Sequence, residues 1–74
     1  LGFMEKQIRR VASNEITIEG KTLRQYVVEI VDHRVVDYYS FQEELPFTEW
    51  LAGKIELRKD KNGFLQAFLN NKLL

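Results

Sequence analysis

Hydrophobic and polar residues alternate along most of this chain, in short segments that are separated by turn-forming residues. A period of two is typical of β-strands, whose side chains point alternately to the two faces of a sheet. The densest example covers residues 26–41, where two runs rich in Val, Ile and Tyr are separated only by Asp32 and His33. Because two turn residues between such runs favour a tight connection, this stretch predicts a β-hairpin and a mostly β fold.

Further segments show the same pattern. Residues 15–19 alternate, with Ile16 and Ile18 on one side, and Gly20 suits the left-handed backbone of the following hairpin turn. Both runs of the hairpin are apolar on two faces, so we expect both faces to be covered. Residues 64–69 also fit helical spacing, but the hairpin signal directly before them favours a strand. The remaining strands are expected at residues 6–12, 54–59 and 64–69, with turns at 13–14 and 60–63.

The single proline predicts a short helix. Pro46 suits the first helical position, because its missing N–H would have no partner there, and Gly53 suits the end. Phe47 and Trp50 would then share one helical face, and the Trp50 indole would be buried against the sheet; a wide turn is the alternative. The expected fold is therefore mostly β: one small antiparallel sheet of five or six strands, folded as a sandwich or partly open barrel, with one short helix near residues 46–52.

The length of 74 residues predicts a single β domain over residues 1–74. A domain of this size buries only about 60% of its chain surface, so a monomer is marginally stable. The chain has no cysteine and one histidine, so neither disulfides nor a structural zinc site reinforces it. Self-association is the remaining way for so small a domain to gain stability, and we expect a homodimer. Residues 1–3 precede Met4, which we expect to be the natural start.

The charges bear on the class of partner. The 11 basic and 11 acidic residues cancel and are mixed along the chain. This argues against a nucleic-acid partner, because phosphate binding needs an excess of Lys and Arg on one face. No apolar run approaches the ~18 residues of a membrane span, and no signal peptide is visible. We therefore expect a cytoplasmic protein without a membrane partner, and the absence of cysteine fits a reducing compartment.

No group of residues predicts catalysis or metal binding. With one histidine in the chain, a nucleophilic triad is not expected. Asp32 and His33 are ordinary turn residues whose side chains point apart, which argues against a metal pair. Glu43, Glu44 and Glu49 offer carboxylate oxygens but lack the spacing of a calcium loop. We therefore expect a protein that is not an enzyme and carries no metal or cofactor.

Aromatic residues are concentrated between positions 38 and 50. They can form core, or they can anchor a peptide, a sugar or a base. Tyr38 and Tyr39 are consecutive on a strand and must point to opposite faces, so one of them points outward, under the helix or at an interface. The candidate interface or ligand residues are Tyr38, Tyr39, Phe41, Phe47 and Trp50.

Two functions remain open. The first is a protein-interaction or self-associating β module without enzymatic activity. The alternative is a small-ligand-binding or accessory domain, in which the aromatic group and the carboxylates of Glu43, Glu44 and Glu49 line the site. The first predicts a dimer, and the second predicts stabilisation by a metal or metabolite.

Hairpin and turn residues at fixed spacings run through the middle of the chain. They are Val27-Val28-Glu29-Ile30, a tight turn, Arg34-Val35-Val36, and then Thr48, Trp50, Gly53, Ile55 and Leu57. This pattern resembles a group of short uncharacterised bacterial proteins and is more distantly similar to the small β-sandwich that precedes the barrel of amidohydrolases. The similarity covers roughly residues 16–59. It implies a shared β-architecture only, because amidohydrolases act through a barrel and a His-x-His pair that this chain lacks.

Overall fold

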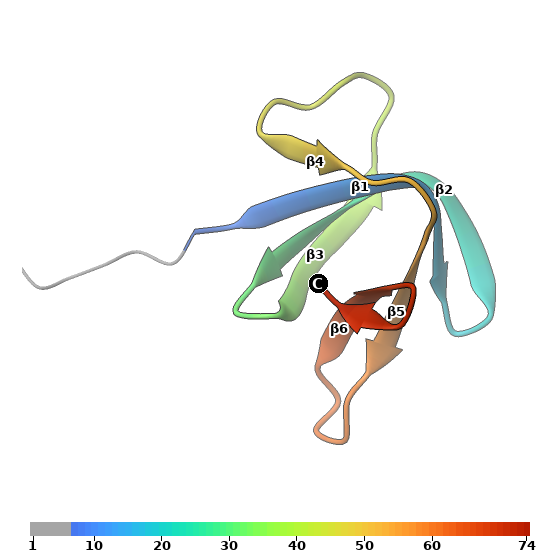
Figure 1. The fold of residues 1–74 in the computed structure, drawn as a ribbon, viewed down its shortest axis with the longest axis vertical. Helices are drawn as coiled ribbons and strands as arrows, with labels where there is room; N and C mark the ends of the chain where they lie inside the picture. Colours follow the sequence, from blue (N-terminus) through green and yellow to red (C-terminus); the bar gives the residue numbers. More distant parts are fainter. Residues whose placement is uncertain (1–6) are drawn as a thin grey trace, which may run out of the picture.

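The computed structural model describes residues 7–74, which form one β-sheet of seven strands and no helix (Figure 1). The order across the sheet is β3-β2-β1-β5-β6-β7, and β4 also pairs with β1. The mostly β class is therefore confirmed, whereas the expected start at Met4 lies outside the described residues. The strands are β1 (Arg9–Ile18), β2 (Lys21–Val31), β3 (Arg34–Ser40), β4 (Thr48–Trp50), β5 (Lys54–Lys59), β6 (Leu65–Leu69) and β7 (Lys72–Leu73).

The first three strands form an antiparallel meander joined by two tight turns. Glu19 and Gly20 make the first turn, with φ angles of 48° and 79°, and Asp32 and His33 make the second, with 52° and 65°. Two consecutive left-handed residues give a turn whose twist matches that of the flanking strands. The hairpin predicted at residues 26–41 is confirmed.

β1 is one continuous strand that bends, which corrects the turn expected at residues 13–14. Its pairing with β2 continues across the bend, from Ser13 opposite Tyr26 to Glu15 opposite Arg24. Figure 1 shows β1 running across the view and then turning down beside β2. Ser and Asn favour turns through local hydrogen bonds, and Ser13 Oγ accepts one from Glu15 N–H at 3.4 Å. The buried hydroxyl also donates to the carbonyl of Gly53, on the segment before β5. That tertiary hydrogen bond joins the bend of β1 to the segment before β5.

The helix expected near residues 46–52 is absent from the described chain. Residues 41–47 form a loop, and the segment after it is the strand β4, parallel to β1. Phe47 has a φ of 54°, a left-handed conformation that cannot continue a helix from Pro46. Pro46 therefore occupies a turn, and the backbone of β4 finds its hydrogen-bond partners in β1.

Two strands share one edge of β1. β4 pairs with its first half and β5 pairs with its second half, both in parallel orientation. The sheet is therefore mixed, which corrects the expected antiparallel sheet. The interruption between β4 and β5 coincides with the bend of β1, where Leu51 N–H donates to the Ala12 carbonyl at 2.9 Å.

The last part of the chain is a second small meander. The strand expected at residues 64–69 is confirmed as β6, and the loop at residues 60–63 connects it to β5. β7 was not expected; it follows a tight turn in which Asn70 and Asn71 have φ angles of 53° and 65°. Asparagine tolerates this conformation better than most residues. The two strands expected at residues 6–12 and 15–19 are the single strand β1, and the additional strands β4 and β7 bring the number found in residues 7–74 to seven.

β3 contains a β-bulge. The register passes from Glu29 opposite Asp37 to Ile30 opposite Val35, so Val36 has no partner on β2. The extra residue changes the alternation, and Val35 then packs against the core while Val36 is exposed. Strict alternation along β3 would put Val35 on the same face as Tyr39, but the bulge puts it on the core face with Tyr38.

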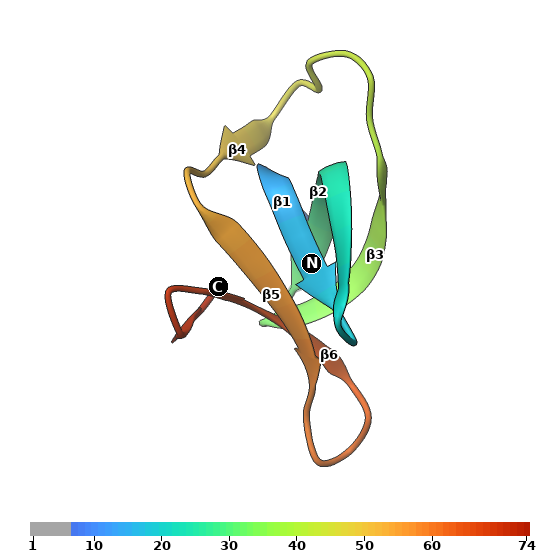
Figure 2. The same ribbon diagram turned by 90° about the vertical axis from the view of Figure 1, so that its right-hand side faces the viewer.

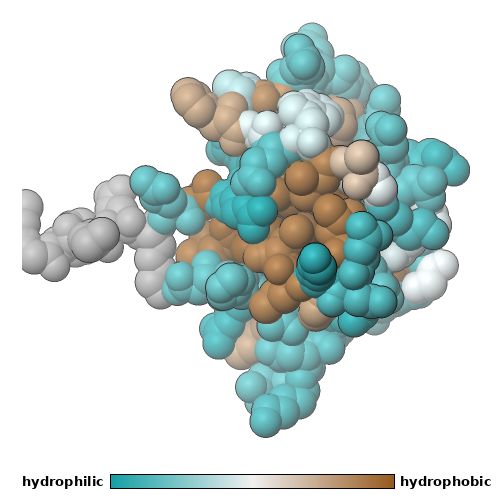
Figure 3. Space-filling view, in the orientation of Figure 1, coloured by the Kyte–Doolittle hydropathy of each residue, from teal (hydrophilic) through white to brown (hydrophobic). Residues whose placement is uncertain are grey.

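The sheet curls around its core without closing. Figure 2 shows β3 and β6 approaching each other at one end of the molecule, where the Arg34 guanidinium lies 3.9 Å from the Phe64 ring centroid. β3 and β6 are not joined by strand pairing. Figure 3 shows a continuous hydrophobic area at the centre of one face, which no described element covers. Within residues 7–74 no helix is long and apolar enough to span a membrane. The buried core cluster is Val11, Ile16, Val28, Ile30, Ile55, Leu57 and Ala67.

Candidate functional site

The sheet register places Tyr38 and Tyr39 on opposite faces, as predicted. Tyr38 lies opposite the core residue Val28, and its ring centroid is 6.3 Å from that of Tyr26, which packs against the core. Tyr39 lies opposite Val27, on the face that we call the outer face. Tyr39 is therefore the tyrosine of the outer face, although Tyr38, which is 36% exposed, is the more accessible of the two.

A row of four residues crosses the outer face from β3 to β4. Tyr39 pairs with Val27, Val27 with Ala12, and Ala12 with Trp50. Directly opposed residues in a sheet share a face, so two aromatic side chains flank two small ones. Phe41 joins them, because its ring meets that of Trp50 edge to face at a centroid distance of 5.1 Å. We call Ala12, Val27, Tyr39, Phe41 and Trp50 the outer aromatic cluster.

The outer aromatic cluster explains why β2 is apolar on both faces. Val27 and Val28 are adjacent in sequence, and both have 0% exposure. Val28 belongs to the core cluster, whereas Val27 lies in the outer aromatic cluster with Ala12, which is also fully buried. The expectation that both faces are covered is confirmed for β2 at Val27 and Val28, and β4 contributes to the cover of the outer face. It is wrong for β3, where Val36 and Tyr38 are 56% and 36% exposed.

Trp50 differs from its expected position. Trp50 is 47% exposed and lies on the strand β4, so the expectation of a buried indole on a helix is wrong. The reason is the pairing of β4 with β1, which sets Trp50 beside Ala12 at the rim of the sheet. The indole both covers the outer face and presents aromatic surface to solvent.

Phe47 is the most exposed large hydrophobic residue of the described chain, at 92%. It lies in the loop directly before β4 and has a φ of 54°. For a residue with a Cβ, this left-handed conformation costs roughly 1 to 2 kcal/mol. Phe47 therefore combines an unfavourable backbone with an uncovered aromatic ring, and neither property is explained by the packing of the fold.

A polar group borders the outer aromatic cluster. The Tyr39 hydroxyl donates to Glu29 Oε2 at 2.5 Å, and Arg10 Nε donates to the same oxygen at 3.0 Å. The hydrogen bond from Tyr39, followed by that from Arg10, lowers the pKa of Glu29, and the same bond to Glu29 raises the pKa of Tyr39. These bonds fix the orientation of the Tyr39 ring beside Val27.

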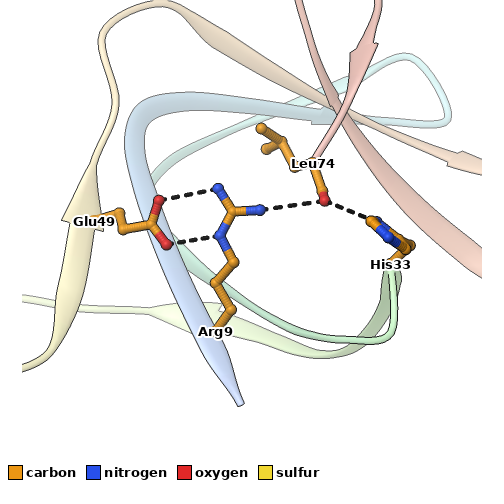
Figure 4. A network of polar contacts seen from close by, with 4 residues as sticks. All are labelled: Arg9, His33, Glu49 and Leu74. Atoms are coloured by element: carbon orange, nitrogen blue, oxygen red, sulfur yellow. Dashed lines mark hydrogen bonds and ion pairs between the residues drawn. The ribbon is translucent and has the colours of Figure 1, made fainter. Parts of the chain in front are cut away.

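The carboxylates considered for a ligand site do not join the aromatic residues. Glu49 lies opposite Val11 on the core side and accepts two hydrogen bonds from Arg9, at 2.6 and 3.0 Å. Figure 4 shows the Arg9 guanidinium between this carboxylate and the backbone oxygen of Leu74, which His33 Nδ1 also approaches at 3.3 Å. This network connects the start of β1, β4, the β2–β3 turn and the end of the described chain.

Other features of a ligand site are also absent from the described residues. Glu43 and Glu44 are exposed in the loop. Residues 7–74 contain no group of three or more His, Cys, Asp or Glu residues that could hold a metal ion. An open depression beside the β2–β3 turn is lined by Val31, Asp32, Arg34 and Val36, and by none of the aromatic candidates.

Sequence reasoning missed two members of this surface. The two-sided hydrophobicity of β2 could have identified Val27. No local signal identifies Ala12, because its aromatic neighbour belongs to β4, far along the chain. The pairing of Arg10 with Glu29 was likewise missed, since it depends on the register of β1 against β2.

No family model, curated protein or solved structure matches this chain. The resemblance to short bacterial proteins and to the amidohydrolase β-sandwich therefore stays a prediction.

Proposed function

We propose that this protein is an interaction module without enzymatic activity that self-associates as a symmetric homodimer through its outer face. The observation that carries the proposal is Phe47, which is 92% exposed and held at a φ of 54°. Strained backbone conformations of this kind concentrate at functional sites. Phe47 directly precedes β4, whose Trp50 is 47% exposed at the rim of the outer face, and the proposed interface includes both residues.

The composition of this surface supports a protein partner. Aromatic residues and arginine are enriched at the centres of protein interfaces, and they account for many of the side chains whose loss weakens binding most. Tyr39 and Phe41 are half-buried and held in place by Glu29 and Trp50. Preorganised rings lose little conformational entropy when a partner covers them.

The charges support a second copy as that partner. The equal numbers of acidic and basic residues mean that no net charge repels two copies. Beside the aromatic row, a second row runs across the outer face from Asp37 through Glu29 to Arg10. A two-fold axis that reverses this row brings the acidic end of one copy to the basic end of the other, which is the self-complementarity that a symmetric dimer requires.

The proposal is tested by Phe47→Asn, measured by sedimentation velocity over a wide range of concentrations. Asparagine adopts the left-handed conformation more readily than phenylalanine. We therefore expect the variant to be as stable as the wild type or up to about 1 kcal/mol more stable as a monomer, while dimerisation weakens at least tenfold.

Phe64→Asn is the matched control. Phe64 is 43% exposed and stacks on Arg34, away from the outer aromatic cluster. We expect this control to lose about 0.5 to 1 kcal/mol of stability with the cation–π contact but to keep the wild-type dimerisation. A wild-type protein that is monomeric at millimolar concentration, or a Phe47→Asn variant with unchanged dimerisation, would contradict the proposal.

A further inference from the structure

One edge of β3 has no strand partner in the described chain, because β3 ends the sheet. Phe41 N–H donates to the Gln25 carbonyl at 2.9 Å, and the pairing continues in register to Asp37. In an antiparallel pair, alternate residues turn their N–H and C=O groups toward the partner. Asp37 and Tyr39 therefore bond toward β2, whereas Tyr38 and Ser40 present their backbone groups to the open edge.

The Tyr38 N–H on this edge is already occupied. Asp37 Oδ1 accepts a hydrogen bond from it at 2.8 Å. Asp37 also follows the bulge at Val36, which interrupts the regular spacing of edge groups. A strand that pairs with β3 must displace this carboxylate from Tyr38 N–H and approach its charge. Charged side chains and bulges are both devices by which natural sheets prevent pairing at their edges.

We propose that the Asp37 carboxylate, through its hydrogen bond to Tyr38 N–H, keeps the β3 edge closed to the same edge of a second copy of this chain. The β3 sequence contains Val35, Val36, Tyr38 and Tyr39, which are strong strand formers, so an uncapped edge is a competent template for antiparallel pairing. This edge lies in the plane of the sheet, whereas the proposed dimer uses the outer face. Asp37 also belongs to the charged row of the outer face, so the test has to suppress the outer-face dimer.

The test compares Asp37→Ala with Asp37→Asn, both made in the Phe47→Asn background so that association through the outer face is suppressed. Asparagine keeps an oxygen acceptor at the position of Oδ1, whereas alanine removes it. We expect Asp37→Ala to dimerise in sedimentation experiments and Asp37→Asn to stay monomeric. In the alanine variant, amide exchange at Tyr38 measured by NMR should slow at least tenfold as the protein concentration rises.

Two results would overturn the inference. If Asp37→Ala stays monomeric at millimolar concentration, the carboxylate does not guard the edge. If both variants dimerise, the oxygen acceptor that asparagine keeps is not enough to close the edge. The charge of Asp37 would then close it, and the hydrogen bond to Tyr38 N–H would not.

A measurement on the unaltered protein keeps the inference testable if the alanine variant fails to fold. Of the two open-edge amides, only that of Tyr38 has a side-chain acceptor in the described structure. Relative to the intrinsic rates, we expect the Tyr38 amide to exchange severalfold more slowly than that of Ser40. Equal protection of the two amides would count against the hydrogen bond on which the inference rests.

Discussion

Substitution of Trp50 by alanine measures how much the outer aromatic cluster contributes to stability. Trp50 is 47% exposed, so about half of a side chain that can bury up to ~250 Å² is removed from water. At about 25 cal/mol per Å², this area corresponds to ~3 kcal/mol. Because an extended reference chain overstates the area buried on folding, the expected loss is about 2 kcal/mol. A fully buried indole would cost about 3 to 5 kcal/mol.

The assay is urea denaturation followed by far-UV circular dichroism, at a concentration low enough that association does not contribute. We expect a lower midpoint with an unchanged slope, since the variant keeps the same fold. A loss below about 0.5 kcal/mol, the range of ordinary surface substitutions, would show that Trp50 does not cover Ala12 and Val27. A loss above about 4 kcal/mol would show that the indole is buried as in a core.

Two further predictions follow from the polar group and from the backbone. The lowered pKa of Glu29 means that its interactions stabilise the fold above its ordinary pKa of 4.5 and are lost as the pH falls through the lower folded value. Glu29→Gln should therefore lose stability at pH 7 and show a shallower decline below pH 4.5 than the wild type in thermal denaturation; parallel curves would contradict this. Gly53 has a φ of 108°, and an added Cβ would lie 3.3 Å from Leu69 Cδ1, whereas Gly20 has open space around it. Both Gly53→Ala and Gly20→Ala force alanine into a left-handed backbone, but only Gly53→Ala also brings the new Cβ close to Leu69. In urea denaturation, Gly53→Ala should therefore lower the free energy of unfolding by roughly 1 kcal/mol more than Gly20→Ala. Equal losses would refute the steric argument.

The local connections of this fold could be predicted from the sequence because their signals are local. The turns at Asp32-His33 and at residues 60–63 lie between alternating runs, and the residues that form them are next to each other. The strand β6 followed from the same argument. These elements are antiparallel neighbours whose register is fixed by a short turn.

The parts that the sequence did not predict depend on contacts between distant segments. Pro46 and Gly53 have the residue types of helix ends, but the edge of β1 offers the intervening backbone a parallel partner. Serine and asparagine at positions 13 and 14 have the composition of a turn, but the Ser13 hydroxyl bonds to Gly53 across the sheet. In both places tertiary pairing overrides a weak local preference.

The candidate site was predicted in part for the same reason. The opposite orientation of Tyr38 and Tyr39 follows from strand geometry alone. The grouping of Tyr39 and Phe41 with Trp50 requires the register of four strands, including β4. Glu49 was linked with the aromatic residues because of its sequence position, yet its neighbour on the sheet is Val11, on the opposite face.

The bent strand β1 has a consequence for how the chain folds. All strand pairing between the first meander and the segments from β4 onward passes through β1 in the described structure. Each meander forms from contacts close in sequence, whereas joining them requires closure of the chain between Ile18 and Lys54, at an entropic cost of about 3 kcal/mol. Non-local parallel pairing of this kind is slow, so docking of the two meanders should limit the folding rate. Until docking occurs, the second edge of β1 is unpaired, and a newly made chain is most open to intermolecular strand pairing during that interval.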